Sequence, residues 1–199
     1  MRDLILRMFM SIDGFVGSTD GDRKWIINPD PVAKAWLIER AWNASLLVMG
    51  SRTFRDMAGY WPTSTDAFAA PMNQIPKAVF SRQGPAILEA ARMVQDNPEA
   101  LQPGAESWTQ ACVASGDLVA EVAKLKARDG KPMVVLGGAA FARSLIAHGL
   151  VDQFELMIHP IALGQGLPIF TELTHPRRFS LVSSTAFPKG SVAQIYRPA

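Results

Sequence analysis

Three short apolar segments each run directly into a glycine or into a Ser-Arg pair. Residues 45–49 (SLLVM) are followed by Gly50, residues 77–80 (KAVF) by Ser81, and residues 133–136 (MVVL) by Gly137. Continuous apolar runs of this length are typical of strands that are covered on both faces, as in a parallel sheet. Helical periodicity resumes soon after the first and third runs, so the chain is predicted to repeat a strand-turn-helix unit and to form an α/β fold.

The remaining segments extend this pattern. A first buried strand is expected at 4–12, and a strand-rich stretch at the C-terminal end leaves no room for crossover helices, which favours antiparallel pairing there. The expected elements are further strands at 108–113, 154–160 and 191–196, and helices at 32–43, 118–128 and 139–148 with a shorter one beginning at 53–57. The prediction is a mixed, mostly parallel sheet with an antiparallel edge.

Length and composition favour one globular domain spanning residues 1–199. The chain is 48% hydrophobic and 19% charged, and no apolar run approaches the roughly 20 residues that span a bilayer. The opening segment MRDLILRMFMSIDG is interrupted by Arg7, so it is interpreted as a strand rather than a signal peptide. We expect a soluble, cytoplasmic protein without membrane association.

Cysteine and histidine usage gives no sign of a disulfide or a metal centre. Cys112 is the single cysteine, and His148, His159 and His175 lack the spacing of a zinc site. We therefore expect no metal. His159, in an apolar strand, is interpreted as structural.

Net charge is +2, and basic and acidic residues are interspersed. This is weak support for nucleic-acid binding, and a local anion site explains the basic balance equally well. The expected partner is a small-molecule substrate and not a nucleic acid.

The ends of the three apolar runs are candidates for a ligand site, because open α/β sheets bind ligands beyond the carboxyl ends of their strands. A helix that starts there presents free backbone N–H groups to an anion. Gly137 and Gly138 remove the Cβ atoms that would hinder a phosphate, and Arg52 and Arg82 supply cations. Each feature alone also fits a tight turn or a solvated surface arginine, and the dinucleotide fingerprint GxGxxG is absent.

Four segments together carry a family resemblance. SIDGFVG, MGSRTF, FSR and the long stretch VLGGAAFARSLIAHGLVDQFELMIHPIALGQGLPIF resemble the dihydrofolate-reductase-like superfamily. They are most similar to standalone proteins like the reductase domain of the bifunctional riboflavin-biosynthesis deaminase-reductase. The resemblance implies a three-layer α/β/α fold, with a mixed, mostly parallel central sheet and an antiparallel C-terminal edge.

The resemblance also implies NADPH as cofactor. It places the pyrophosphate beside two groups of residues, the adenosine 2′-phosphate beside Ser81 and Arg82, and the nicotinamide beside Phe15, Val16 and Gly17. The two pyrophosphate groups are Gly50, Ser51, Arg52 and Thr53, and Gly137, Gly138, Ala139, Ala140 and Phe141.

Asp30 is the approximate match to the carboxylate that orients a pterin in dihydrofolate reductases, and it is the candidate catalytic residue. Hydride transfer to an imine or carbonyl also needs a proton donor, and Asp13 and Asp30 are the acidic residues nearest the nicotinamide position that the resemblance implies. Turn-forming or helix-capping roles are the alternative for both. The family and the apolar C-terminal third together suggest a homodimer.

The leading hypothesis is an NADPH-dependent reductase that transfers a hydride to a small, planar or carbonyl- or imine-bearing substrate. The alternative is a nucleotide-binding regulatory or structural module of the same fold without turnover. A nucleic-acid-binding protein is a third interpretation, motivated only by the pI of about 8.8.

Overall fold

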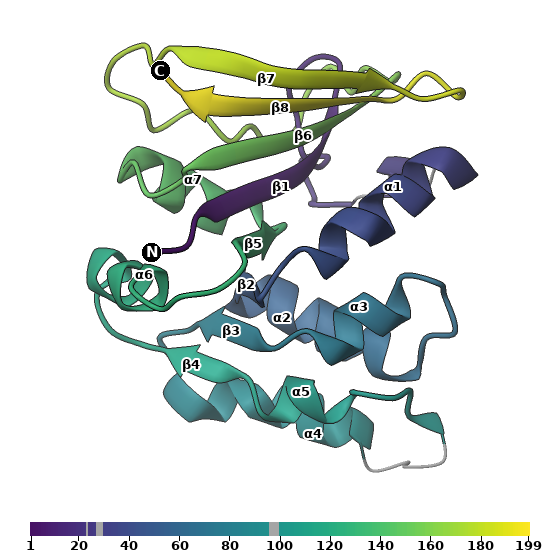
Figure 1. Cartoon of the computed structure of the whole chain (residues 1–199), viewed down its shortest axis with the longest axis vertical. Coiled ribbons are helices and arrows are strands. Elements are labelled where there is room, and N and C mark those ends of the chain that lie inside the picture. The colour runs from purple at the N-terminus through teal and green to yellow at the C-terminus, as the bar shows by residue number, and fades with distance from the viewer. Residues whose placement is uncertain (23, 27–29, 96–99) are drawn as a thin grey trace. The chain divides into compact units, whose positions relative to one another are not determined.

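The structure, a computed structural model, describes residues 1–22, 24–26, 30–95 and 100–199 (Figure 1). By the density of its internal contacts the chain divides into two compact units, one made of residues 1–2 and 38–138 and the other of residues 3–37 and 139–199. That the whole chain forms one domain stays a prediction.

The elements, in chain order, are β1 (Leu4–Ser11), η1 (Lys24–Ile26), α1 (Pro31–Trp42), β2 (Leu46–Gly50), α2 (Ser51–Ala58), η2 (Trp61–Thr63), α3 (Ala69–Gln74), β3 (Lys77–Phe80), η3 (Gly84–Leu88), α4 (Glu89–Gln95), α5 (Glu106–Thr109), β4 (Cys112–Ala114), α6 (Leu118–Lys126), β5 (Met133–Leu136), α7 (Ala139–Ala147), β6 (Gln153–His159), β7 (Phe179–Ala186) and β8 (Val192–Pro198).

The first unit contains four parallel strands in the order β4-β3-β2-β5. Val48 lies opposite Val135 on β5 and opposite Ala78 on β3, and each of these three side chains is completely buried. Burial on both faces explains why the sequence shows continuous apolar runs here rather than an alternating pattern. The strands predicted at 77–80 and 133–136 are confirmed.

The strand predicted at 108–113 is wrong in its first half. Residues 106–109 form the short helix α5, and only Cys112–Ala114 are extended, as β4. Trp108 is fully buried on this helix, where its Nε1 donates to Asn73 Oδ1 at 2.8 Å and its ring lies 5.8 Å from that of Phe54. The apolar residues that suggest a strand in the sequence therefore belong to a short buried helix.

Lys77 is a buried cationic residue in this unit, 2% exposed at the start of β3. Its Nζ donates to the carbonyl oxygen of Asn73 at 3.0 Å and to the hydroxyl of Ser107, and it lies 4.6 Å from the centre of the Trp108 ring. Burial lowers the pKa of Lys77 to about 7, although the negative charge of Glu106 opposes the shift. Lys77 thus joins β3 to helices α3 and α5 through an amine that is readily neutralised.

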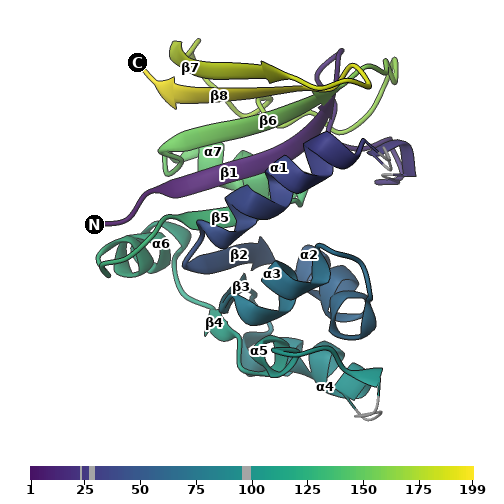
Figure 2. The same ribbon diagram turned by 45° about the vertical axis from the view of Figure 1, so that its right-hand side comes forward.

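The second unit contains β1, β6, β8 and β7, in that order (Figure 2). The pair β1 and β6 is parallel, whereas β6 with β8 and β8 with β7 are antiparallel. The predicted antiparallel C-terminal edge is therefore confirmed. The sequence did not predict β7 at all.

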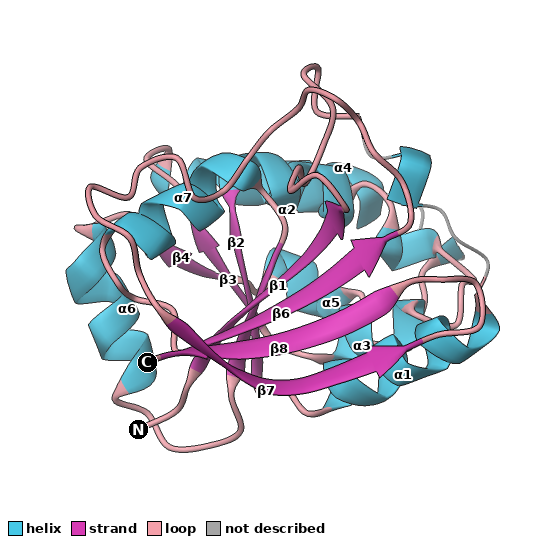
Figure 3. Ribbon diagram, turned by 90° about the horizontal axis from the view of Figure 1, so that it is seen from above, coloured by secondary structure: helices cyan, strands magenta, loops and turns pink. Residues whose placement is uncertain are grey.

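Helices α1 and α7 lie on opposite sides of this second group of strands (Figure 3). On the α1 side, Ala33 packs in one buried cluster with Met157, Phe187 and Ala193, and the Trp36 ring meets Phe187 edge-on at 5.7 Å. Leu145 and Ile146 are the buried residues on the C-terminal half of α7. Helices on both faces give the unit its three layers.

A buried ion pair connects β1 and β6. Arg7 and Glu155 are directly opposite in the parallel register, and Arg7 Nε lies 2.7 Å from Glu155 Oε2, with the two side chains 7% and 2% exposed. Gln153 Nε2 donates to the other carboxylate oxygen at 3.1 Å. Both oxygens of Glu155 are therefore engaged in the core.

Candidate functional site

The carboxyl ends of β2, β3 and β5 meet at one edge of the parallel strands in the first unit. Gly50 pairs with Phe80, the last residue of β3, and β5 runs parallel to β2 on its other side. Because parallel neighbours end at the same edge, the structure brings together the predicted residues that follow them. These are Gly50, Ser51, Arg52, Thr53, Ser81, Arg82, Gly137 and Gly138.

Helix α2 begins at this edge without a side-chain cap. Its N-cap is Gly50, in extended geometry at φ −83° and ψ 167°, and no side chain accepts a hydrogen bond from the first turn there. The Ser51 hydroxyl instead donates to the carbonyl oxygen of Phe80 at 3.1 Å, which fixes the end of β3 against the start of α2. The first-turn N–H groups are therefore available to an anion, and the first turn contains no acidic residue.

Gly137 and Gly138 follow β5 in a conformation that side chains rarely adopt, with φ values of 64° and 81°. In this left-handed region a Cβ would be strained, so glycine is the residue that suits both positions. Two successive residues without Cβ atoms leave the backbone open to close approach. Helix α7 starts immediately afterwards, and Ala139, Ala140 and Phe141 form its first turn.

Residues that follow the end of β3 supply the positive charge of the candidate site. Ser81 is buried, its N–H donates to Ala114, and its hydroxyl accepts the N–H of Gln83 at 3.2 Å. The Arg82 side chain is exposed. Sequence reasoning missed Arg55, one turn into α2, whose guanidinium hydrogen-bonds the side chain of Gln83, directly after Ser81 and Arg82. Its spacing of three residues from Arg52 along a helix was the available signal.

The second unit holds the remaining predicted cofactor residues, Phe15, Val16 and Gly17, in the loop that follows β1. The loop is fixed at both sides, because the Val16 N–H donates to the carbonyl oxygen of Leu167 and the Leu167 N–H donates to that of Gly17, at 2.9 and 2.8 Å. A Cβ on Gly166 would lie 2.4 Å from the Gly17 oxygen. The backbone of residues 15–17 is thus set by a second loop that follows β6.

Asp13 ties these two loops together. Its carboxylate accepts the N–H of Gly164 at 2.7 Å and that of Leu163 at 3.0 Å, and the hydroxyl of Ser11 donates to its other oxygen. The Ser11 hydroxyl bond and then the two backbone bonds hold the pKa of Asp13 below its usual range. The sequence motif LGQG marked this second loop, but not its link to Asp13.

Asp30 lies at the start of α1, where both its oxygens accept backbone hydrogen bonds. Oδ1 accepts the N–H groups of Val32 and Ala33 at 3.0 and 3.2 Å, and Oδ2 accepts that of Lys189 at 3.0 Å. The Lys189 bond is the largest cause of a pKa below the usual range for Asp30. Asp30 is therefore a buried helix cap that stays ionised, with Pro31 in the first helical position.

His159 is buried at the end of β6 between the rings of Phe9 and Trp25, at 5.4 and 5.9 Å. Its Nδ1 lies 3.3 Å from the hydroxyl of Ser191. Burial lowers the pKa of His159, so the ring stays neutral at physiological pH. This environment fits the structural interpretation of the residue.

The described residues lack two further kinds of feature. No helix among them is long and apolar enough to cross a bilayer. Within the same ranges, no three His, Cys, Asp or Glu side chains gather as a metal site would require.

Comparison with known proteins assigns the chain to a family. Residues 2–193 match the RibD C-terminal domain. The protein YyaP of Bacillus subtilis (strain 168) is 28% identical over 201 residues, which cover 98% of this chain and 94% of YyaP. Among solved structures, RibD of Acinetobacter baumannii superposes with a TM-score of 0.71 at 16% identity, covering 100% of this chain and 58% of that one.

The fold has a more distant counterpart as well. Dihydrofolate reductase from Enterococcus faecalis matches with a TM-score of 0.57 at 14% identity, over 98% of this chain and 96% of the other. The expected three-layer, dihydrofolate-reductase-like α/β fold is thereby confirmed. The chain therefore belongs to the RibD C-terminal domain family.

Proposed function

We propose that this protein is an NADPH-dependent reductase that transfers a hydride to a small, planar or carbonyl- or imine-bearing substrate. The observation that carries the proposal is the shared edge of β2, β3 and β5. There the uncapped start of α2, the left-handed pair Gly137-Gly138 and the exposed Arg82 offer three different kinds of contact to a phosphorylated ligand. The dihydrofolate reductase of Enterococcus faecalis, which shares the fold, was solved with NADP(H) bound.

The residues present fit such a cofactor. The N–H groups of Ser51, Arg52 and Thr53 would face the pyrophosphate, and Gly137 and Gly138 leave room for it. Ser81 and Arg82, which follow β3, would bind the 2′-phosphate that distinguishes NADPH from NADH. Ala139, Ala140 and Phe141 would continue the pyrophosphate contact, and the backbone of Phe15, Val16 and Gly17 would contact the nicotinamide. Bound NADPH supplies the hydride.

The proton that accompanies the hydride needs a separate source. Asp30 is the acid that the sequence suggests for this step, but its carboxylate is held ionised by three backbone N–H groups. A carboxylate with a lowered pKa is a poor proton donor near neutral pH. We infer that Asp30 contributes to the reaction by holding the start of α1 in place.

The cofactor preference provides the first test. Titration calorimetry should give a lower dissociation constant for NADPH than for NADH. Arg82→Ala should remove about tenfold or more of that preference, because a charge-assisted phosphate contact is lost. Arg92→Ala is the matched control, since Arg92 is also an exposed arginine of the first unit and pairs with Glu89. Equal affinities for the two cofactors, or the same loss in both variants, would contradict the proposal.

The substrate class needs a second test. NADPH oxidation can be followed optically against dihydrofolate, the ribosylaminopyrimidine of riboflavin biosynthesis, quinones and small ketones. We expect turnover of a planar or carbonyl-bearing compound other than dihydrofolate, because three backbone N–H groups already occupy the Asp30 carboxylate and leave it little capacity to orient a pterin. Efficient reduction of dihydrofolate that Asp30→Asn impairs would overturn this expectation. Tight NADPH binding without any turnover would favour a nucleotide-binding module of the same fold.

A further inference from the structure

Two side-chain nitrogens on neighbouring rings of the second unit are buried without a hydrogen-bond partner among the described residues. They are Nε1 of Trp25, in the short helix η1, and Nε2 of His159, the last residue of β6. The centres of the two rings are 5.9 Å apart and their planes meet at 83°. Buried polar atoms without a partner are rare and costly, so two on adjacent rings indicate a place where another molecule supplies the partner.

His159 lies at the edge of the sheet where a ligand is expected. It pairs with Ser11, the last residue of β1, across parallel strands, and α/β sheets bind ligands at the carboxyl ends of such strands. The loop that follows Ser11 contains residues 15–17, beside which we propose that the nicotinamide lies. Contacts with Phe9 and Ser191 explain the position of the His159 ring, which is 6% exposed, but not the state of its Nε2.

Partly exposed apolar side chains lie on the same face of the sheet. Of β1, whose residues are all described, only Phe9 is partly exposed, and its ring lies 5.4 Å from that of His159. Trp36 and Leu37 on α1 are also partly buried, and with Phe9 they pack against the buried cluster that contains Met157. A flat ring that lies on these side chains would direct its polar group towards His159.

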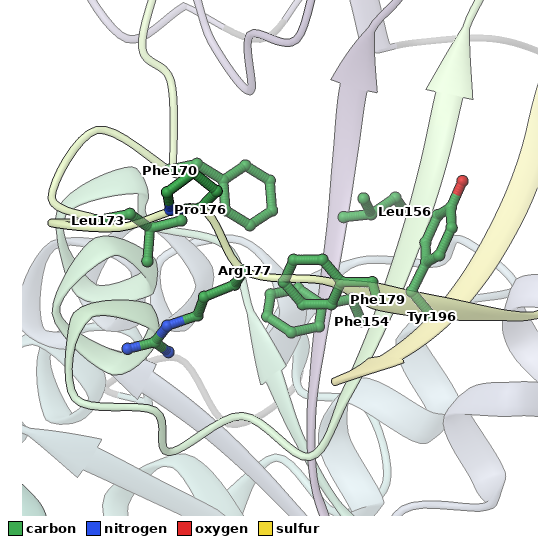
Figure 4. Close-up of a pocket in the computed structure, with 8 residues that line it drawn as sticks. All are labelled: Phe154, Leu156, Phe170, Leu173, Pro176, Arg177, Phe179 and Tyr196. Atoms are coloured by element: carbon green, nitrogen blue, oxygen red, sulfur yellow. The ribbon is translucent and has the colours of Figure 1, made fainter. Parts of the chain in front are cut away.

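An apolar cavity of about 400 Å³ lies on the opposite face of β6 (Figure 4). Phe154 and Leu156 line it, and side chains alternate between the two faces of a strand, so His159 points away from it. The polar side chains that line this cavity, Arg177 and Tyr196, already donate hydrogen bonds. The two nitrogens therefore indicate a polar site on the α1 face, separate from the cavity.

The donor pattern of the two nitrogens selects a carbonyl oxygen. The nitrogen of an indole can only donate a hydrogen bond. Burial lowers the pKa of His159, so its ring is neutral and carries a single N–H group. If the hydroxyl of Ser191, 3.3 Å from Nδ1, donates to Nδ1, that hydrogen is on Nε2. Two donors on adjacent rings then suit one oxygen atom with two lone pairs.

We propose that Trp25 Nε1 and His159 Nε2 bind a carbonyl oxygen of the substrate, which makes the substrate a planar ring compound that carries a carbonyl group. The oxygen enters between the two rings, so Trp25 turns away from His159 when it binds. Trp25 belongs to a three-residue helix outside the sheet, and its movement breaks no pairing between strands. The two residues orient the substrate, and neither transfers a proton. The inference rests on the proposed function for the position of the nicotinamide alone.

Binding of indanone, a flat ring ketone, in the absence of cofactor tests the proposal. Indane has the same carbon skeleton without the carbonyl oxygen, so it measures binding to apolar surfaces alone, the cavity included. Nitrogen NMR of protein labelled at histidine should show the Nε2–H tautomer for His159 and a shift of Nε2 with indanone but not with indane. The exposed His148 and His175 are internal controls. The other tautomer, or an equal response to both compounds, would overturn the proposal, as would no response, since a trapped water would then pair the two nitrogens.

Variants separate recognition of the oxygen from packing of the rings. His159→Phe and Trp25→Phe each keep an aromatic ring and lose the donor, so each should weaken indanone binding about tenfold and leave indane binding unchanged. The nitrogen signal of the remaining partner reports binding in each variant. His159→Gln supplies an amide N–H near the position of Nε2 and should restore most of the affinity. Trp42→Phe is the matched control, because Trp42 is an exposed tryptophan at the end of α1.

The variants also distinguish this inference from the proposed function. Equal losses in His159→Phe and His159→Gln would show that His159 serves only packing and would refute the inference. Unchanged indanone binding in Trp25→Phe, which does not alter the strand, would refute it as well. If indanone binds with the expected pattern but no compound oxidises NADPH, the carbonyl site stands and the proposed reductase activity fails.

Discussion

The guanidinium of Arg7 and the carboxylate of Glu155 face each other across neighbouring parallel strands, 2.7 Å apart and almost completely buried. A buried pair of this kind gives little net stability, yet removing one member leaves the other charge in a medium that solvates it poorly. The effect of either residue on the stability of the fold therefore depends on the presence of the other.

Glu155→Gln should lower the free energy of unfolding by about 3 kcal/mol, because Arg7 loses its counter-charge within the core. Urea denaturation followed by circular dichroism measures the change. The double variant Arg7→Met and Glu155→Met should recover most of the loss, since two apolar side chains replace two charges. A single variant within about 0.5 kcal/mol of wild type would show that the pair is not coupled.

Gly138→Ala should weaken NADPH binding at least tenfold, because the new Cβ occupies the approach to the backbone after β5 and strains a residue at φ 81°. Gly149→Ala is the control for the strain alone. Gly149 also has a positive φ of 65°, but it lies after the C-terminal end of α7, where a Cβ would make only ordinary contact with Arg177. Calorimetry on both variants separates the two effects. Equal weakening in both would mean that Gly138 acts only as a turn residue.

Asp13→Asn should loosen the connection between the loops after β1 and β6, because a neutral amide oxygen accepts the Leu163 and Gly164 N–H groups more weakly than a carboxylate does, and the amide NH2 group cannot accept the Ser11 hydroxyl. We expect faster hydrogen exchange at these two amides and roughly three- to tenfold weaker NADPH binding. Asp20→Asn is the matched control, since Asp20 hydrogen-bonds with Ser18 and Asp22 within its own loop. Unchanged exchange at residues 163 and 164 would refute this role of Asp13.

Lys77 gives the protein a characteristic dependence of stability on pH. Its pKa is about 7 in the folded chain and about 10.5 when unfolded, so between these values the unfolded chain binds a proton that the folded chain does not. The free energy of unfolding should therefore rise with pH across this window, by up to about 1.4 kcal/mol per pH unit. Lys77→Met should remove this slope, and the difference between the two denaturation series isolates it. Parallel series would show that Lys77 stays charged in the fold.

Much of the site's framework is predictable because it depends on local signals. The strands before Gly50, Ser81 and Gly137 are short apolar runs ended by residues that break strands, and parallel pairing brings their ends together by geometry alone. The capping role of Asp30 follows similarly from its place before a helical segment. These features need no knowledge of contacts between distant segments.

The features that were missed depend on such contacts. Asp13 accepts a hydrogen bond from Gly164, 151 positions further along the chain, and no residue near Asp13 in the sequence indicates this contact. Trp108 was assigned to a strand because the apolar signal does not distinguish a buried helix turn from a strand over so few residues. Strand β7 is not predicted from the sequence, because all of its residues after Phe179 are exposed. It therefore lacks the alternation of apolar and polar residues that marks a half-buried strand.

The close approach of Gly166 to the Gly17 oxygen also matters to anyone who would redesign this protein. A Cβ added at position 166 would lie only 2.4 Å from that oxygen, so the sequences of the loops after β1 and β6 cannot be varied independently. A library that varies one loop must keep the length and the glycine of the other. Ile12, which directly follows β1 and is 64% exposed, is a position where variation costs the scaffold little. Mutagenesis of these loops should therefore begin at Ile12 and leave Asp13, Gly17 and Gly166 unchanged.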